Sequence, residues 1–347
     1  MKKLCGFFPL LSKAALPAVC LFISACTSGL NGELSHSLFA EDGRKTAVLK
    51  VTSWNVETFF DSKNDGREYK EFLTCEKWGK GAYEERLKRL CSVIKALDSD
   101  VFIMEEIENE GVLFDISNFL AGEWNHRKVY NYSCFAKDEN SSIGCGLLSR
   151  YPLSEMSLCG LDVRTQGNVP GMRPIIRVMV EKGGKKLTLL VNHWKSMSGG
   201  QEKTEVWRNR QEGLLSAVMQ SCLDRGEVVL AAGDFNRDVC SFFKNQETGQ
   251  ILMRQYEKAV LQEKGVEVKN PWFLQDGSLI MPGSYFFQGE WSRIDNFFYC
   301  GDCEILSFGP ETEGEWCSSE DGRPFGYKIF TGQGYSDHLP LSCVIRF

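Results

Sequence analysis

The sequence predicts a single large α/β domain, and three features of the chain support this fold class. Apolar runs with the length of buried strands recur along the chain, and stretches with the spacing of amphipathic helices lie between them. Hydrophobic residues make up 43% of the sequence and charged residues 25%, which are the proportions of a folded globular protein. No internal repeat, low-complexity run or clear linker divides the 347 residues, so we expect one domain rather than two.

The N-terminus has the features of an export signal. Basic residues precede an apolar run at residues 14–25, which is too short to span a membrane. The run ends in Ile-Ser-Ala-Cys26, which resembles the lipobox of bacterial lipoproteins, where the signal is cut before a cysteine that then carries a lipid. We expect residues 1–25 to be the signal peptide, 26–46 a tether and 47–347 the domain. The chain would then be an exported lipoprotein of a bacterial cell envelope, held to a membrane through Cys26. A plain cleaved signal with an incidental cysteine is the alternative.

Strands and helices alternate along the predicted domain. The helix at 83–97 is indicated by apolar residues on one face with arginine and lysine on the other, whereas residues 56–80 show no periodicity and are expected to form a loop. The remaining strands are indicated by short apolar runs. The expected strands are residues 47–54, 101–104, 143–149, 173–180, 187–192 and 228–232. The expected helices are residues 83–97, 111–120, 204–222 and about 250–263.

The stretch Val-Val-Leu-Ala-Ala-Gly-Asp-Phe-Asn at residues 228–236 is the most informative in the chain. Five small or apolar residues predict a buried strand, which Gly233 breaks so that Asp234 and Asn236 project beyond its end. The rim beyond the strand ends is where α/β sheets bind ligands. A carboxylate and an amide at this spacing suit the positioning of a water and the binding of an oxyanion, although both residues are also common turn formers.

Other predicted strands deliver polar side chains in the same way. Carboxylate and amide oxygens suit a hard cation such as Mg²⁺, histidine and asparagine donors suit phosphoryl oxygens, and an aspartate suits an attacking water. The set therefore favours metal-dependent hydrolysis of a phosphate ester, with Mn²⁺ or Ca²⁺ as alternatives to Mg²⁺. The strand-end residues are Asn55, Glu106, His193, Asp234, Asn236, Asp295, Asp337 and His338.

The net charge of −6 argues against a protein that holds nucleic acid by a broad basic surface, but not against an enzyme that meets phosphate through a metal ion. No feature points to a protein partner. The 14 cysteines lack the spacing of a disulfide-stapled domain. Cys300-Gly-Asp-Cys303 could be half a zinc site or a redox pair, but no second such motif follows, which favours a coincidence at a strand end or a local bridge.

The ordered set of motifs resembles the endonuclease/exonuclease/phosphatase superfamily, which has the deoxyribonuclease I-like fold. This resemblance implies a four-layered α/β sandwich, with two packed mixed sheets flanked by helices, and divalent-metal-dependent cleavage of a phosphoester. The motifs span residues 52–340, nearly all of the predicted domain. They are Ser-Trp-Asn55-Val, Met-Glu-Glu106-Ile-Glu-Asn, Val-Asn-His193-Trp-Lys-Ser, Gly-Asp234-Phe-Asn236, Arg-Ile-Asp295 and Ser-Asp337-His338.

The resemblance also implies roles for these residues. Glu106 is similar to the main metal ligand of the family, supported by Asn55 and Asp337. Asp234 would orient or deprotonate the attacking water, and Asn236 would bind the phosphate. His193 and His338 would contact the scissile phosphate, with Asp295 orienting His338.

Two features depart from the family pattern. Glutamine commonly precedes the metal-binding glutamate, but Glu105 stands there in this chain, so the choice of ligand between the two acids is open. The tyrosine of the family also has no clear counterpart. Tyr130 and Tyr132 are the nearest candidates, and packing is the expected role of each.

Nuclease, sphingomyelinase and inositol-phosphate phosphatase activities all occur in this superfamily, so its fold does not define a substrate. The loop after His193, with the segment around Tyr285 and Trp291, is similar to exported bacterial members presumed to be nucleases, which favours DNA as the substrate. Lys195 could contact a second phosphate or lie solvated in its loop. A phospholipid phosphodiesterase or a phosphatase is the alternative, followed by a non-catalytic surface lipoprotein.

Overall fold

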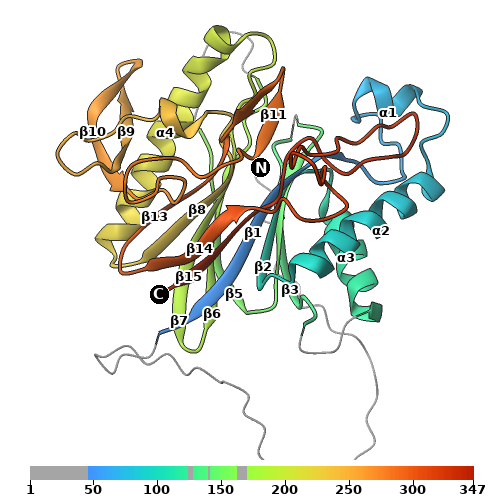
Figure 1. Cartoon of the computed structure of the whole chain (residues 1–347), viewed down its shortest axis with the longest axis horizontal. Coiled ribbons are helices and arrows are strands. Elements are labelled where there is room, and N and C mark those ends of the chain that lie inside the picture. The colour runs from blue at the N-terminus through green and yellow to red at the C-terminus, as the bar shows by residue number, and fades with distance from the viewer. Residues whose placement is uncertain (1–45, 124–127, 140, 162–169) are drawn as a thin grey trace, which may run out of the picture.

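Two mixed β-sheets packed face to face form the centre of the protein in the computed structural model (Figure 1), which describes residues 46–123, 128–139, 141–161 and 170–347. The predicted signal peptide, Cys26 and nearly all of the predicted tether lie outside the described residues. None of the described helices is long and apolar enough to cross a bilayer.

The first sheet has six strands in the order β14-β15-β1-β2-β4-β3. Only the central pair, β1 and β2, runs parallel, and the other neighbours are antiparallel. The strands are β1 (Val48–Phe59), β2 (Val101–Ile107), β3 (Tyr132–Ala136), β4 (Gly144–Ser149), β14 (Glu304–Pro310) and β15 (Leu341–Arg346).

The second sheet has five strands in the order β13-β8-β7-β6-β5. It is mixed in the same manner, because β7 and β8 are parallel and the remaining pairs are antiparallel. The strands are β5 (Leu153–Cys159), β6 (Ile175–Lys182), β7 (Lys185–His193), β8 (Val228–Asp234) and β13 (Asp295–Cys300).

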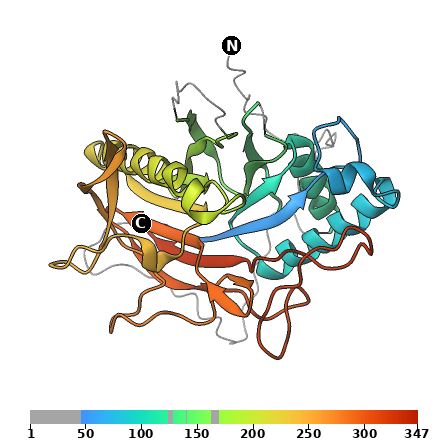
Figure 2. The same cartoon turned by 90° about the horizontal axis from the view of Figure 1, so that it is seen from above.

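Helices cover the outer faces of both sheets and complete four layers (Figures 1 and 2). Two helices lie outside the first sheet and one outside the second, with a short helix in the connection after β1. They are α1 (Lys70–Thr74), α2 (Lys80–Leu97), α3 (Glu110–Glu123) and α4 (Gln201–Asp224). A 3₁₀ turn (Val239–Ser241) follows β8, and a small hairpin of β11 (Tyr285–Phe287) and β12 (Glu290–Ser292) precedes β13. The expected layered α/β architecture is confirmed.

The central strands are buried on both faces, which explains their near-continuous apolar sequences. In β2, Val101 and Ile103 belong to the core between the two sheets, whereas Phe102 and Met104 belong to the core beneath the helices. The same alternation holds in β1, where Leu49 faces the second sheet. The first sheet is therefore fixed in register by two cores at once, whereas the buried apolar residues of the second sheet belong to one continuous core.

The helix predicted around residues 250–263 is wrong. Strands β9 (Ile251–Glu257) and β10 (Val260–Val268) form an antiparallel hairpin there. The turn consists of Lys258 and Ala259, both with positive φ, and lacks the asparagine or glycine that usually marks such a turn. The buried residues alternate along β9, and Ser216 of α4 donates to the Met253 carbonyl oxygen at 2.7 Å. Packing against α4 therefore outweighs the helical propensity of the segment.

Cys300 and Cys303 are separate thiols near the end of β13, and the Cys303 thiol donates to the Cys300 carbonyl oxygen at 3.7 Å. This contact is local to the turn. The Cys-x-x-Cys motif is thus a strand-end feature, and neither cysteine is bridged to the other.

Gly213 provides a test of how closely the hairpin packs on α4. A Cβ atom at this position would lie 2.4 Å from Tyr256 Cβ, whereas a Cβ at Gly122 in α3 would meet nothing within 4 Å. Gly213→Ala should destabilise the protein by about 1–3 kcal/mol because the hairpin must move. Gly122→Ala, the matched control, should stabilise it by up to about 1 kcal/mol. Urea unfolding followed by circular dichroism measures both, and a Gly213→Ala protein as stable as the wild type would contradict close packing.

Candidate active site

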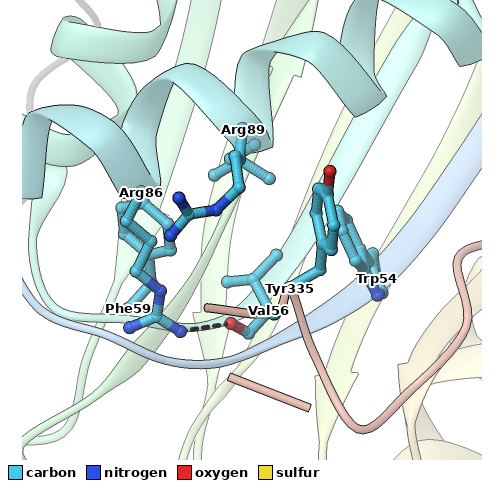
Figure 3. A pocket seen from close by; sticks show the side chains of 8 residues that line it. Trp54, Val56, Phe59, Arg86, Arg89 and Tyr335 are labelled. Atoms are coloured by element: carbon cyan, nitrogen blue, oxygen red, sulfur yellow. Dashed lines mark hydrogen bonds between the residues drawn. The ribbon is translucent and has the colours of Figure 1, made fainter. Parts of the chain in front are cut away.

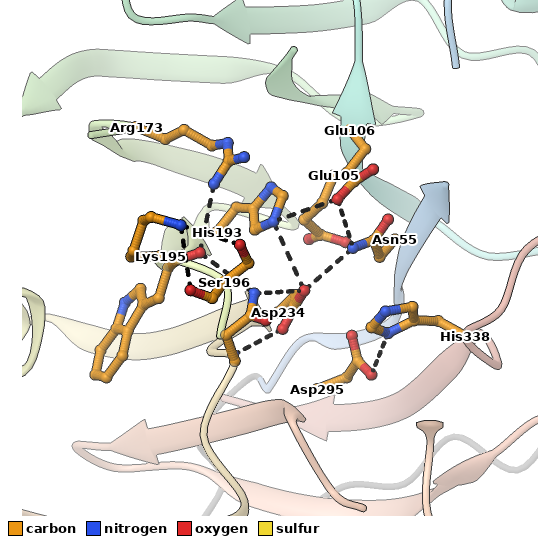
Figure 4. Close-up of polar contacts among 12 residues, drawn as sticks. Asn55, Glu105, Glu106, Arg173, His193, Lys195, Ser196, Asp234, Asp295 and His338 are labelled. Carbon is orange, nitrogen blue, oxygen red and sulfur yellow. Dashed lines mark hydrogen bonds and ion pairs between the residues drawn. The ribbon is translucent and has the colours of Figure 1, made fainter. Parts of the chain in front are cut away.

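The ends of strands from both sheets converge on one group of polar side chains (Figure 4). In the second sheet, His193 of β7 and Asp295 of β13 are the direct neighbours of Asp234 of β8. The first sheet contributes Asn55 of β1, whose amide nitrogen lies 3.1 Å from Asp234 Oδ2. Backbone register thus places three of the predicted residues together, and a side-chain hydrogen bond from the facing sheet adds Asn55.

Asp234 lies at the centre of this group and is almost fully buried. Asn236 donates to it twice, from its backbone N–H at 2.7 Å and from its side-chain amide at 2.9 Å. Burial, followed by the neighbouring Asp295 charge, raises the pKa of Asp234 to about 7. A carboxyl group with this pKa can accept a proton near neutral pH.

Gly233 makes the approach of β7 and β8 possible. Its φ is +136°, and a Cβ atom would lie 1.9 Å from the Asn192 carbonyl oxygen. The glycine that was expected to break the strand therefore allows Asp234 to sit directly beside His193.

Glu106 is directed to the group by a bulge in β2. Its φ is +66°, and the pairing of β2 with β4 skips a residue between Glu105 and Ile107. The Glu106 carboxylate accepts from the Thr58 N–H at 2.8 Å and faces the Asn55 amide at 3.4 Å. Its side chain is 19% exposed, so one carboxylate of the cluster remains open to solvent.

Glu105 has the opposite environment. It is completely buried and accepts from the Ser53 hydroxyl at 2.9 Å, while its second oxygen has no partner. Burial, followed by the Asp295 charge, raises the pKa of Glu105 well above its ordinary value. Of the two acids, Glu106 is the one placed to meet a metal ion.

The two histidines have opposite electrostatic environments. His193 Nε2 lies 3.6 Å from Asp234 and 3.7 Å from Glu106. Burial, with nearby Arg173, lowers the pKa of His193 and favours its neutral form. Burial also disfavours charge on His338, but Asp295 accepts from its Nδ1 at 2.9 Å and raises the pKa of His338 well above its ordinary value. His338 is therefore the cationic member.

Asp337 lies at the solvent edge of the group, with 44% of its side chain exposed and its carboxylate 3.9 Å from His338 Nε2. Its backbone is held by Glu57, an acid that the sequence analysis placed in a loop. Glu57 accepts from the N–H groups of Asp337 at 3.0 Å and Tyr327 at 2.7 Å. Burial, then the Asp337 charge, raises the pKa of Glu57 to about 7. In the sequence, the position of Glu57 two residues after Asn55 could have indicated that Glu57 belongs to the site.

Two basic side chains border the group next to Asn236. Lys195 donates to its neighbour Ser196 at 3.1 Å, and burial with nearby Arg173 lowers the pKa of Lys195. The Trp194 carbonyl oxygen accepts from Arg173 at 3.4 Å and from the Asn236 amide at 3.3 Å. Arg173, which the sequence analysis treated only as the start of a strand, is therefore beside the predicted phosphate-binding residue.

Neither predicted tyrosine candidate belongs to this group. The Tyr130 hydroxyl is buried and donates to the Ser99 carbonyl oxygen at 2.8 Å, which confirms a packing role for that residue. Tyr69 lies nearer to the group, because its pKa is raised by burial and then by the negative charge of the Glu106 carboxylate. Tyr285 also approaches the site, with its ring centroid 4.6 Å from that of His338.

The donor set fits a hard divalent cation. Glu106 and Asp337 offer carboxylate oxygen atoms, and within the described part of the chain no lysine or arginine forms an ion pair with either one. Asn55 would add its Oδ1, which accepts from the Glu57 N–H while its amide nitrogen faces Glu106 and Asp234. The raised pKa values of Glu57 and Asp234 reflect burial and crowding with other carboxylates. A bound cation would relieve this repulsion, so the residues present suit a metal ion.

Comparison with known proteins supports the same chemistry. The model of the Endonuclease/Exonuclease/phosphatase family matches residues 50–346. Truncated TDP2 from Caenorhabditis elegans is similar, with a TM-score of 0.55 and 16% identity over 86% of this chain and 97% of that one. The human Nocturnin catalytic domain has a TM-score of 0.51 and 16% identity, covering 88% and 97%.

A Bacteroides thetaiotaomicron protein of the endonuclease/exonuclease/phosphatase family has a TM-score of 0.50 and 15% identity, covering 88% of this chain and 99% of that one. At these identities the structural likeness concerns the fold. No curated protein was found to match the sequence.

The contrast between the two acids of β2 predicts their roles. Glu106→Gln should weaken Mg²⁺ binding and lower turnover together, because it removes a charge from a site with few protein ligands. Glu105→Gln, the matched control, should be much milder because its raised pKa already favours a neutral side chain. Titration calorimetry with Mg²⁺ compares the two, and the reverse order would assign the metal to Glu105. Full activity in excess chelator would exclude a metal requirement.

Proposed function

Because the chain belongs to the endonuclease/exonuclease/phosphatase family, whose members are phosphoester hydrolases, we propose that it is a divalent-metal-dependent phosphodiesterase that cleaves DNA. The observation that carries the proposal is the arrangement around Asp234. A carboxyl group with a pKa of about 7 lies between a neutral histidine, His193, and a cationic one, His338, with the open carboxylate of Glu106 beside them.

In the proposed reaction, Glu106, Asn55 and Asp337 hold Mg²⁺, which polarises the phosphoryl group when bound. Asp234 accepts a proton from the attacking water or orients it. The imidazolium of His338 stabilises the negative charge that develops on the phosphoryl oxygens, and its Asp295 partner keeps the ring oriented.

Binding of the phosphate group falls to Asn236, His193 and Arg173. The Asn236 amide and the Arg173 guanidinium both donate to the Trp194 carbonyl oxygen, which places the two groups side by side. Lys195 follows Trp194 in the loop and is suited to binding a neighbouring phosphate of the same DNA strand. A substrate with successive phosphodiesters, such as DNA, would use both positions.

The structural neighbours are compatible with such a substrate. TDP2 from D. rerio, solved as a complex with a single strand DNA product, has a TM-score of 0.50 and 16% identity over 86% of this chain. The DNA in that complex is bound by TDP2, and we take it as support for proposing a DNA substrate here. The negative net charge of −6 makes the metal and these few basic groups the main contacts expected with a polyanion.

Nicking of supercoiled plasmid DNA in Mg²⁺ tests the proposal. The wild type should nick the plasmid, whereas Asp234→Asn and His338→Ala should each lower turnover by about 10²–10⁴. Asp295→Ala should lose about as much as His338→Ala, and the double variant little more, because the two side chains act as one unit.

RNA, sphingomyelin and inositol phosphates belong in the same assay, with Asp234→Asn as the inactive control. Hydrolysis of sphingomyelin by a wild type that leaves DNA and RNA intact would replace the nuclease proposal with a phospholipid phosphodiesterase. Hydrolysis of none of these substrates, by a protein that binds metal, would leave the surface-lipoprotein alternative.

We also propose that Cys26 carries a lipid that holds the enzyme to a bacterial membrane, on the evidence of the Ile-Ser-Ala-Cys sequence. Cys26→Ser should release the protein from the membrane fraction or stall its processing. Cys20→Ser, which changes a cysteine within the predicted signal, should leave the mature mass unchanged. Intact-mass measurement of the native protein decides the matter, and a mature chain that begins elsewhere without acyl mass would exclude the anchor.

A further inference from the structure

A bulge at residues 56–58 of β1 contacts each of the predicted metal ligands. Between Asn55 and Phe59 the pairing of β1 with β2 shifts, and both Glu57 and Thr58 have positive φ. The Glu57 N–H donates to Asn55 Oδ1 at 3.0 Å, and the Thr58 N–H donates to Glu106 Oε2 at 2.8 Å.

The third predicted ligand is joined to the same bulge through a side chain. The Glu57 carboxylate accepts from the Asp337 N–H at 3.0 Å. Asn55, Glu106 and Asp337 come from three separate parts of the chain, so the bulge is the element they share. Movement of the bulge would therefore disturb a hydrogen bond to each of the three.

Arg86 of α2 holds the bulge from the helical side. Its guanidinium donates to the carbonyl oxygens of Thr58 at 3.0 Å, Val56 at 3.1 Å and Glu57. Figure 3 shows the bond to Val56. These carbonyl groups are consecutive and turn away from the regular ladder because of the bulge. A planar fork of donors can satisfy them together, which a single ammonium group cannot do in the same geometry.

The Arg86 side chain is itself immobilised. It is 2% exposed, and its guanidinium lies 3.6 Å from the ring centroid of Tyr327 and 4.7 Å from that of Phe59. Among the described residues no carboxylate forms an ion pair with it. A buried arginine whose hydrogen bonds go to backbone carbonyl groups fixes backbone conformation rather than neutralising a charge.

We propose that Arg86 is a positioning residue that presets the metal site by holding the 56–58 bulge. The inference rests on the proposed metal-dependent function and extends it to a residue outside the site. Groups that orient metal ligands from behind commonly contribute about 10–100-fold to metal affinity. Loss of the Arg86 fork should therefore weaken metal binding while leaving the ligands themselves intact.

Arg89 supplies a matched control. Arg89 lies on α2, as Arg86 does. The two arginines line a small pocket together with Trp54 and Tyr335 (Figure 3). The Arg89 guanidinium donates to the Gly332 carbonyl oxygen at 2.5 Å rather than to the bulge. An Arg89→Lys variant therefore changes the same kind of residue in the same helix without touching the metal ligands.

The test is titration of Mn²⁺ into the metal-free full-length protein, followed by the electron paramagnetic resonance of free Mn²⁺. Arg86→Lys and Arg86→Ala should raise the Mn²⁺ dissociation constant by about 10–100-fold, and Arg89→Lys should leave it near the wild-type value. At saturating Mg²⁺ the turnover of Arg86→Lys should recover towards that of the wild type. Thermal melts in EDTA check that each variant is folded.

The inference would be overturned by any of the following results. Folded Arg86 variants that bind Mn²⁺ like the wild type would exclude positioning of the metal site. Unfolding of both Arg86 variants in EDTA would assign Arg86 a general role in stability. If the wild type binds no Mn²⁺, the proposed metal dependence is wrong as well. If the wild type binds Mn²⁺, and Glu106→Gln abolishes this binding but Arg86→Lys does not change it, only the role of Arg86 is rejected.

Discussion

Repulsion between buried carboxylates is the constraint on which the site depends. Asp234 is flanked by Asp295 on its own sheet, and burial together with this charge raises the pKa of Asp234 to about 7. Glu105 approaches the same pair from the first sheet and has a raised pKa for the same reasons. The cluster persists because amide groups of Asn55 and Asn236 donate to Asp234 and because His338 supplies a positive charge. Such a site favours a proton or a metal ion, and metal-assisted hydrolysis uses both.

The architecture meets this constraint by building the site from two kinds of backbone. Regular pairing places His193, Asp234 and Asp295 side by side, with the core that lies between the sheets and extends beneath α4 holding their strands in register. Irregular backbone places the proposed metal ligands: the bulges at residues 56–58 and at Glu106 turn side chains and N–H groups out of the regular strand pairing. Strain of this kind is maintained only where surrounding contacts determine it, which is the role inferred for Arg86.

His193 and Asp234 could be predicted because each ends an apolar run long enough to identify a strand. Asp295 instead begins β13, and Asp337 and His338 precede β15. Glu57 could not be found in this way, since β1 continues to Phe59 through a bulge whose polar sequence has the character of a loop. Arg173 precedes its strand and has no pattern of its own. The β9–β10 hairpin was missed because its turn, Lys258-Ala259, adopts positive φ without the residues that usually permit it. In each case tertiary contacts determine the conformation.

The two histidines show why geometry is needed to assign roles within a correctly identified site. Both are buried strand-end or loop residues beside carboxylates, and the sequence alone treats them as a pair. Only His338 has a carboxylate, Asp295, within hydrogen-bonding distance of a ring nitrogen, whereas His193 lies 3.6 Å from Asp234 and has Arg173 nearby. One ring is therefore held cationic and the other neutral. A phosphoryl group bound between them would have the cationic His338 on one side and the uncharged donor His193 on the other. Negative charge that develops in the reaction would therefore be stabilised more strongly on the His338 side.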